Sequence, residues 1–253
     1  MKLRDRILWG LAVGGEILEE VLTSGSRAYQ RDKLFIWTPA RYSKKKFNGL
    51  LNRLDREGYL QRVLIDGKVH FRLSGAGKRL LTDTWPGLKF RQKSWDGFWR
   101  VIIFDIKEED RKSRDDLREF LVKLRFGRLQ NSTYISPYDF DNSFLDWLKA
   151  RKLRGRVMLM ECKQKHLGKP DRLADAIWGL EQINKDYQAV IERLSTRFGI
   201  KSKQKREEFL KRVYQQYLTV LTKDPFLPSE LLPKEWMADK CQKFILRAGV
   251  IKE

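Results

Sequence analysis

The sequence predicts an α+β fold, in which helical segments near both ends flank a central segment rich in strands. Three observations predict it. Near the N-terminus a helical pattern precedes two strand-like runs joined by Asp66-Gly67. The central part alternates short apolar runs with amphipathic stretches, and beyond Pro170 apolar residues recur at helical spacing. We therefore expect three parts along the chain, with these bounds: 1–82, a linker at 83–94, 95–165 and 171–253.

The charge balance indicates a polyanionic partner. The 253 residues include 53 Lys and Arg against 33 Asp and Glu, a formal net charge of +20. An excess of this size favours nucleic acid, ahead of an anionic membrane. The alternative is a basic surface that only keeps the protein soluble.

Few residues are available for covalent or metal chemistry. Two cysteines exclude a disulfide framework, and two histidines are too few for a histidine-based metal site or catalytic triad. We expect no cofactor. The apolar run 7–15 is bounded by charges and fits an amphipathic helix better than a signal peptide, and no run is long enough for a membrane span. We expect a cytoplasmic protein.

The first part reads as a winged helix-turn-helix. A first helix uses Leu3, Ile7, Leu11, Leu18 and Leu22, and a second short helix fits within 26–37. Thr38 as N-cap and Pro39 at the first position start a third helix, which ends near Glu57 before Gly58. It buries Phe47, Leu50, Leu51 and Leu54. An Asp-Gly loop is a strong hairpin signal, so 59–65 and 68–73 form a wing, and Ser74 caps a last helix to Leu81.

The basic helix is the predicted contact with double-stranded DNA. Its candidate DNA-binding residues, together with one from the wing, are Arg41, Lys44, Lys45, Lys46, Asn48, Arg53 and Lys68. A charge run alone is usually a solvated helix face, but a third helix followed by a hairpin is where a winged helix meets DNA. Lysines act mainly on phosphates, whereas Arg41 and Asn48 are the better candidates for base edges.

The central part has the order of a ferredoxin-like βαββαβ domain. A strand at 98–104 ends at Asp105, and a helix follows with acidic residues 108–110 at its start and Gly127 as its C′ residue. A second strand covers 129–136. The next helix is capped by Asp139 or Asp141 and has Phe144, Leu145 and Leu148 on its apolar face, and a buried strand at 157–160 completes the domain.

The last part is expected to be helical. One amphipathic helix runs from Leu173 to Leu194 and another from Phe209 to Leu221, followed by a proline-rich crossing at 224–236 and a short helix to Ala248. Trp178 and Trp236 are candidate walls of an effector pocket, because pockets favour junctions between parts. The alternative is that both tryptophans belong to the core.

The central and C-terminal parts resemble the PaaX family of bacterial repressors. The matching residues are Trp95-Asp96-Gly97 with Trp99, Phe104-Asp105-Ile106, residues 126–130, Ser136-Pro137, and the later clusters Asp224-Pro225, Leu227-Pro228, Leu231-Leu232-Pro233 and Trp236. The resemblance implies a winged-helix homodimer that represses operons and is released by an acyl-CoA thioester. The lysine-rich third helix and short C-terminal part depart from the family pattern, which leaves the operon and the inducer open.

The central part is also similar to the small ferredoxin-fold CRISPR-associated nuclease. There the aspartate ending the first strand corresponds to Asp105, and a later strand to Gly127-Arg128-Leu129-Gln130. The resemblance implies a metal-dependent nuclease in which a dimer joins two Asp105 carboxylates. The alternative is that the Asp105 side chain only caps the following turn or hydrogen-bonds to its backbone. Phosphate-binding loops and serine nucleophile motifs are absent from the sequence. We expect a dimeric DNA-binding repressor without enzyme activity, with the nuclease as the alternative.

Overall fold

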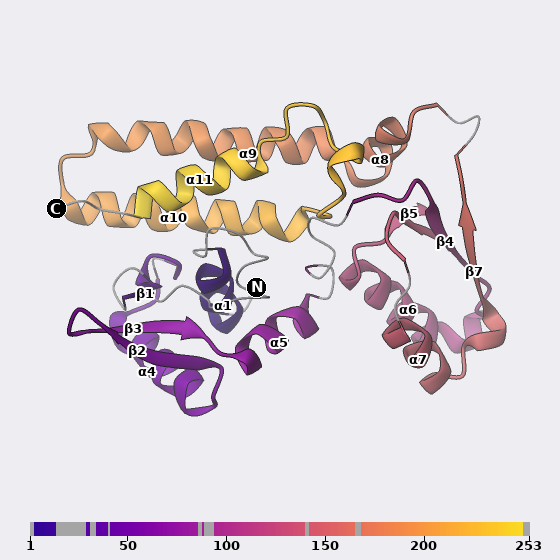
Figure 1. The fold of residues 1–253 in the computed structure, drawn as a ribbon, viewed down its shortest axis with the longest axis horizontal. Helices are drawn as coiled ribbons and strands as arrows, with labels where there is room; N and C mark the ends of the chain where they lie inside the picture. The colour runs from indigo at the N-terminus through magenta and orange to yellow at the C-terminus, as the bar shows by residue number, and fades with distance from the viewer. Residues whose placement is uncertain are drawn as a thin grey trace. The chain divides into compact units, whose positions relative to one another are not determined.

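The computed structural model of the chain describes residues 3–13, 29–30, 34–39, 41–85, 88, 94–139, 142–164 and 168–249. These residues form helices and two antiparallel sheets, so the α+β class is confirmed (Figure 1). Contacts within the chain define two compact units. The first contains residues 1–83, 182–224 and 235–253, and the second contains 84–181 and 225–234. The division into three sequential parts stays a prediction.

The N-terminal part of the first unit combines short helices with a three-stranded sheet. Its elements are α1 (Leu3–Val13), β1 (Tyr29–Gln30), α4 (Lys44–Arg56), β2 (Leu60–Ile65), β3 (Lys68–Leu73) and α5 (Gly75–Thr84), and the strand order is β1-β3-β2. Strands β2 and β3 form the predicted hairpin, in which Ile65 pairs with Lys68. Asp66 and Gly67 both have positive φ, as a two-residue type I′ turn requires.

Helix α4 starts later than predicted. Thr38 does not cap it, because the Thr38 side chain is buried and its hydroxyl donates to the Phe35 carbonyl at 2.7 Å. The N-cap is Ser43, whose hydroxyl accepts from the Lys46 backbone N–H at 3.3 Å. The predicted apolar face is confirmed, as is the predicted cap of α5, where the Ser74 hydroxyl accepts from the Gly77 N–H.

Several expectations fall outside the described residues. These are the continuation of the first helix through Leu18 and Leu22, half of the short helix in 26–37, most of the linker at 83–94, and the capping role of Asp141. Within 26–37, Tyr29 and Gln30 form strand β1 rather than part of a helix.

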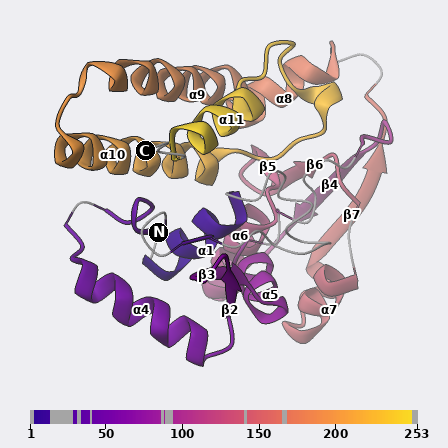
Figure 2. The same ribbon diagram turned by 60° about the vertical axis from the view of Figure 1, so that its left-hand side comes forward.

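The remaining elements of the first unit are helices and a short turn. They comprise α9 (Leu180–Ser195), the short turn η4 (Thr196–Gly199), α10 (Lys203–Lys223) and α11 (Ala238–Gly249), and in both views α9 and α10 run side by side with α11 beside them (Figures 1 and 2). The single helix expected at 173–194 is wrong, because Gly179, with φ of 65°, separates a helix at Pro170–Trp178 from α9. The buried Tyr214 hydroxyl of α10 donates to the Ile245 carbonyl of α11 at 2.8 Å. Trp37 stacks on Tyr214 with 4.7 Å between ring centroids, so α10 also contacts the segment just before α4.

The second unit has the predicted alternation of strands and helices. Its elements are β4 (Trp99–Phe104), η2 (Glu108–Asp110), α6 (Arg111–Lys123), β5 (Gly127–Gln130), β6 (Thr133–Ser136), α7 (Asn142–Ala150), η3 (Arg154–Arg156), β7 (Val157–Cys162), α8 (Pro170–Trp178) and η5 (Ser229–Leu231). The strand order is β5-β6-β4-β7. Buried residues of β4, β6, α6 and α7, among them Ile102, Tyr134, Leu121 and Phe144, form its core.

Four expectations for this unit are wrong in detail. The strand predicted at 129–136 is a hairpin of two strands, β5 and β6, with a turn at 131–132. Strand β7 lies at the sheet edge, where the side chains of Met158 and Met160 are exposed rather than buried. In α7 the Leu145 side chain is exposed, whereas Phe144 and Leu148 are buried.

The fourth correction concerns Gly127. The left-handed residue after α6 is Arg125, with φ of 68°, and Gly127 is the first residue of β5. A Cβ at Gly127 would lie 2.2 Å from Cγ2 of Ile177 and 2.7 Å from the Trp178 ring. The absent side chain therefore lets α8 approach the sheet.

No helix in the described ranges is both long enough and apolar enough to cross a bilayer.

Candidate nucleic-acid interface

Helix α4 separates an apolar face from a polar one. Its buried side chains, Phe47, Leu50, Leu51 and Leu54, follow the helical repeat and attach it to the first unit. The face turned away from them carries residues at positions i, i+4, i+7 and i+11, namely Lys45, Gly49, Asn52 and Arg56, all exposed. This outward row presents two cations, one amide and a gap without a side chain.

The predicted DNA-binding residues of this segment flank that row or precede it. Arg41 lies before the helix, with its guanidinium 5.8 Å from the centre of the Tyr42 ring. Lys44 and Lys46 are exposed on opposite flanks, and the Lys44 ammonium lies 5.9 Å from the centre of the Phe35 ring. Asn48 is half-buried, whereas Arg53 is exposed with its Nε 3.9 Å from a Glu57 carboxylate oxygen.

Arg62 of β2 attaches the hairpin to α4. Its Nε lies 2.6 Å from a carboxylate oxygen of Asp55, and its Nη2 donates to the Asn52 side-chain oxygen at 3.2 Å. These bonds set the position of the hairpin beside the helix, and they leave the Asn52 NH2 group to donate elsewhere. Lys68, at the start of β3, is exposed next to the turn.

The cations of this region are largely uncompensated. Within the described ranges, no carboxylate lies in ion-pair distance of Arg41, Lys44, Lys45, Lys46, Arg56 or Lys68. Burial, and to a smaller extent these cations, lower the pKa of two neighbouring basic groups. Burial lowers the pKa of Arg6, and Arg41 lowers it further. Burial also lowers the pKa of Lys211, to which Lys44 adds while Glu207 opposes it. The surface around α4 therefore favours anions.

Sequence reasoning missed Asn52 and Arg56. The signal that identifies them is their spacing of seven and eleven residues from Lys45, which places all three on one face of a helix. The late start of α4 strengthens this reading, because Arg41 is then not part of the helical face.

Asp105 is exposed just beyond the end of β4. Its backbone N–H donates to the Arg156 carbonyl at 3.0 Å. In the described part of the chain no group of three or more His, Cys, Asp or Glu side chains is placed to hold a metal ion. A metal role for Asp105 is thus left to an arrangement of two copies, which stays a prediction.

The two tryptophans named as effector candidates lie in different units. In the second unit, Trp178 donates to the Arg125 carbonyl at 3.3 Å and stacks on Trp99 with 6.3 Å between ring centroids. In the first unit, Trp236 packs edge-on against Tyr187 at 5.8 Å. Both side chains are only half-buried, and their role in effector binding stays a prediction.

Comparison with protein families matches both later parts of the chain. The model described as the PaaX protein central Cas2-like domain matches residues 92–174, and the model of the PaaX-like protein C-terminal domain matches residues 178–249.

Two individual proteins are similar to the chain. The transcriptional repressor PaaX of Escherichia coli (strain K12) is 25% identical over 197 residues, which cover 74% of this chain. The match spans 62% of that relative's length. A solved structure, the uncharacterized protein Rv0674 from Mycobacterium tuberculosis, has 19% identity and a TM-score of 0.57 over 92% of each chain, which shows a shared fold.

Proposed function

The chain belongs to the PaaX-like family, and from that premise we propose that it is a cytoplasmic, DNA-binding transcriptional repressor without enzyme activity of its own. Residues 1–82 act as a winged helix-turn-helix in which α4 is the recognition helix and the β2–β3 hairpin is the wing. The observation that carries the proposal is the outward face of α4, where exposed cations with no carboxylate partner among the described residues lie opposite a buried apolar face. The repressor name of the Escherichia coli relative supports it.

The side chains around α4 divide by the chemistry of their contacts. Lys44, Lys45, Lys46 and Arg56 are assigned to phosphate oxygens, because point charges bind the backbone without reading sequence. Arg41, Asn48 and Asn52 are assigned to base edges, where guanidinium and amide groups bind bases bidentately, and Asn52 contributes the donor NH2 group that Arg62 leaves available. Arg53 contributes from the flank of α4, and Lys68 binds phosphate from the wing.

Pairing of two copies completes the site. One winged helix reads one half-site, so a two-fold dimer is the expected form. We assign pairing to residues 95–165, as a ferredoxin-like domain; the order β5-β6-β4-β7 of four antiparallel strands with two helices supports this assignment. The helical residues 171–253 are assigned to binding a small effector such as an acyl-CoA thioester, which releases the DNA, with Trp178 and Trp236 as candidate walls.

A metal-dependent nuclease is the second candidate. The observation that favours it is the exposure of Asp105 at the end of the first strand of a segment that matches a Cas2-like family model. Two such carboxylates brought together by a dimer can hold a divalent cation beside a phosphate.

Selection of bound sequences from random double-stranded DNA tests both candidates in one assay. The repressor enriches a two-fold symmetric site and returns the DNA intact, with magnesium or manganese present. Parallel incubation of Asp105→Ala distinguishes the nuclease, whose cleavage disappears in that variant. Enrichment of no sequence, or metal-dependent cleavage that requires Asp105, contradicts the proposed repressor.

A further inference from the structure

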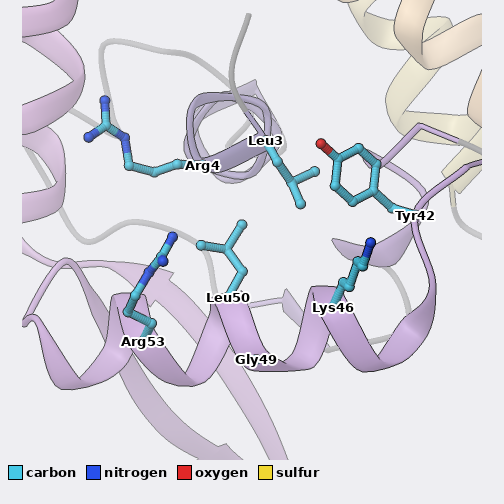
Figure 3. A pocket seen from close by; sticks show the side chains of 7 residues that line it. All are labelled: Leu3, Arg4, Tyr42, Lys46, Gly49, Leu50 and Arg53. Carbon is cyan, nitrogen blue, oxygen red and sulfur yellow. The ribbon is translucent and has the colours of Figure 1, made fainter.

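A cavity lies beside α4 on the flank that faces α1. Its volume is about 480 Å³, and it is lined by Leu3, Arg4, Tyr42, Lys46, Gly49, Leu50 and Arg53, all in the first unit. Figure 3 shows Leu3 of α1 and Leu50 of α4 directed toward each other, with Tyr42 beside them. The same view shows Arg4 and Arg53 on one side of these leucines and Lys46 on the other.

The lining combines an apolar floor with a cationic rim. Leu50 is 8% exposed, so its side chain belongs to the interior, and Leu3 is half-buried. Three of the seven lining residues are cationic and none is acidic. Arg4 and Arg53 each have one carboxylate in range, Asp5 at 2.9 Å and Glu57 at 3.9 Å, whereas Lys46 has none among the described residues.

Gly49 lies at the exposed edge of the cavity. A Cβ placed on Gly49 meets no atom within 4 Å, so the backbone there borders free space. A glycine in the middle of a helix costs about 1 kcal/mol relative to alanine.

We infer that this cavity binds a small organic anion: a carboxylate or phosphate monoester carrying an aromatic or branched apolar group. Its size lies in the lower part of the range of ligand pockets, about 300–1,000 Å³. The leucines and Tyr42 cover the apolar group, and the cations bind the anionic head by charge-assisted hydrogen bonds. A DNA backbone or an inorganic anion offers the charge but has no apolar group for the floor.

Binding at this cavity also competes with DNA, a consequence that rests on the proposed function. Lys46 and Arg53 belong to the flank of α4, and a ligand that neutralises them removes two charges from the DNA-binding surface. Binding of the anion itself is measured without DNA, so it succeeds or fails independently of the repressor assignment.

Calorimetric titration of the full chain with four probes tests the inference. Phenylpropionate and phenyl phosphate are expected to bind, whereas phenylpropanol, which lacks the charge, and inorganic phosphate, which lacks the apolar group, are not. Absence of binding by both aromatic anions up to about 10 mM contradicts the inference, because a specific site for them requires at least millimolar affinity. If inorganic phosphate binds as tightly as the aromatic anions, the inference is also contradicted, and the cavity is then a site for phosphate alone, such as a phosphate of a DNA strand.

Variants then locate the binding. Tyr42→Ala removes the side chain beside the two leucines and should weaken binding of the aromatic anions about tenfold or more, and Lys46→Gln combined with Arg53→Gln should do the same. The matched control is Lys240→Gln with Lys243→Gln, which removes the same charge from exposed positions of α11. Circular dichroism checks that each variant is folded. Unchanged affinity in both cavity variants, or an equal loss in the control, places the ligand elsewhere and refutes the inference.

Discussion

Removing the outward cations of α4 should reduce the salt dependence of DNA binding. The change is Lys45→Ala combined with Arg56→Ala, since both side chains are exposed on the face opposite Phe47 and have no carboxylate in range in the described part of the chain. Alanine has the highest helix propensity, so these exposed replacements keep α4 helical. Any loss of DNA affinity in this variant therefore comes from the missing charges and not from unfolding of α4.

The magnitude follows from counterion release. Each phosphate contact contributes about 0.9 to the slope of log K against log salt, so two lost contacts lower the slope by about 1.8. Relative to binding at 1 M salt, this corresponds to about 60-fold weaker binding at 0.1 M, or about 2.5 kcal/mol. At 0.4 M salt the same loss is only about fivefold, because releasing the same counterions into a more concentrated salt solution gains less entropy.

Fluorescence anisotropy across a salt series measures this effect. The assay uses wild type, the α4 double variant, and a control with Lys240→Ala and Lys243→Ala, which removes two exposed cations from α11. The control should keep the wild-type slope. If the α4 variant also keeps the wild-type slope, or if the slope falls equally in both variants, α4 is not the DNA-binding helix. The net charge then attracts DNA without one particular binding surface.

Three further predictions follow from particular contacts. Arg41→Ala should cost about 1–3 kcal/mol on the preferred DNA site and relax the preference at one base position, which binding-site selection with the variant measures. The Arg100 guanidinium lowers the pKa of the Asp96 carboxyl to about 2, so the charged form contributes stability above pH 4 that is lost as the pH falls through about 2. Urea unfolding should find Asp96→Asn less stable than wild type at pH 6, with a difference that shrinks at pH 2–3; a constant difference contradicts the assignment. Gly127→Ala should destabilise the fold by about 1–3 kcal/mol, because the new methyl group meets Ile177 and Trp178. Gly155→Ala, where a Cβ has open space, is its matched control in thermal unfolding.

Contacts between α10 and the segment before α4 connect the C-terminal helices to the candidate interface. The buried Lys211 of α10 places its ammonium 3.3 Å from the centre of the Phe35 ring, on which Lys44 also lies. Gln215 donates to the Trp37 carbonyl at 2.9 Å. A displacement of α10 would therefore alter the environment of the first residue of α4.

Local patterns in the sequence determined the elements around the interface. The apolar spacing of Phe47, Leu50, Leu51 and Leu54 predicts α4, and the Asp66-Gly67 turn predicts the hairpin, because helical repeat and turn chemistry depend only on neighbouring residues. The net charge likewise indicates an anionic partner without any knowledge of the fold. The helix and the hairpin were predicted correctly from sequence alone, whereas the anionic partner stays a prediction.

Tertiary structure decided the features that depend on residues distant in sequence. Thr38 and Ser43 are both good N-caps, and the choice of Ser43 follows from the burial of Thr38. The sequence places Gly127 where a glycine often ends a helix, but in the structure Gly127 is the position at which Trp178 of α8 approaches the sheet. The cavity exists because Leu3 and Arg4 of α1 pack beside α4. Such pairings depend on how elements dock, and side-chain packing between distant segments leaves no periodic trace in the sequence.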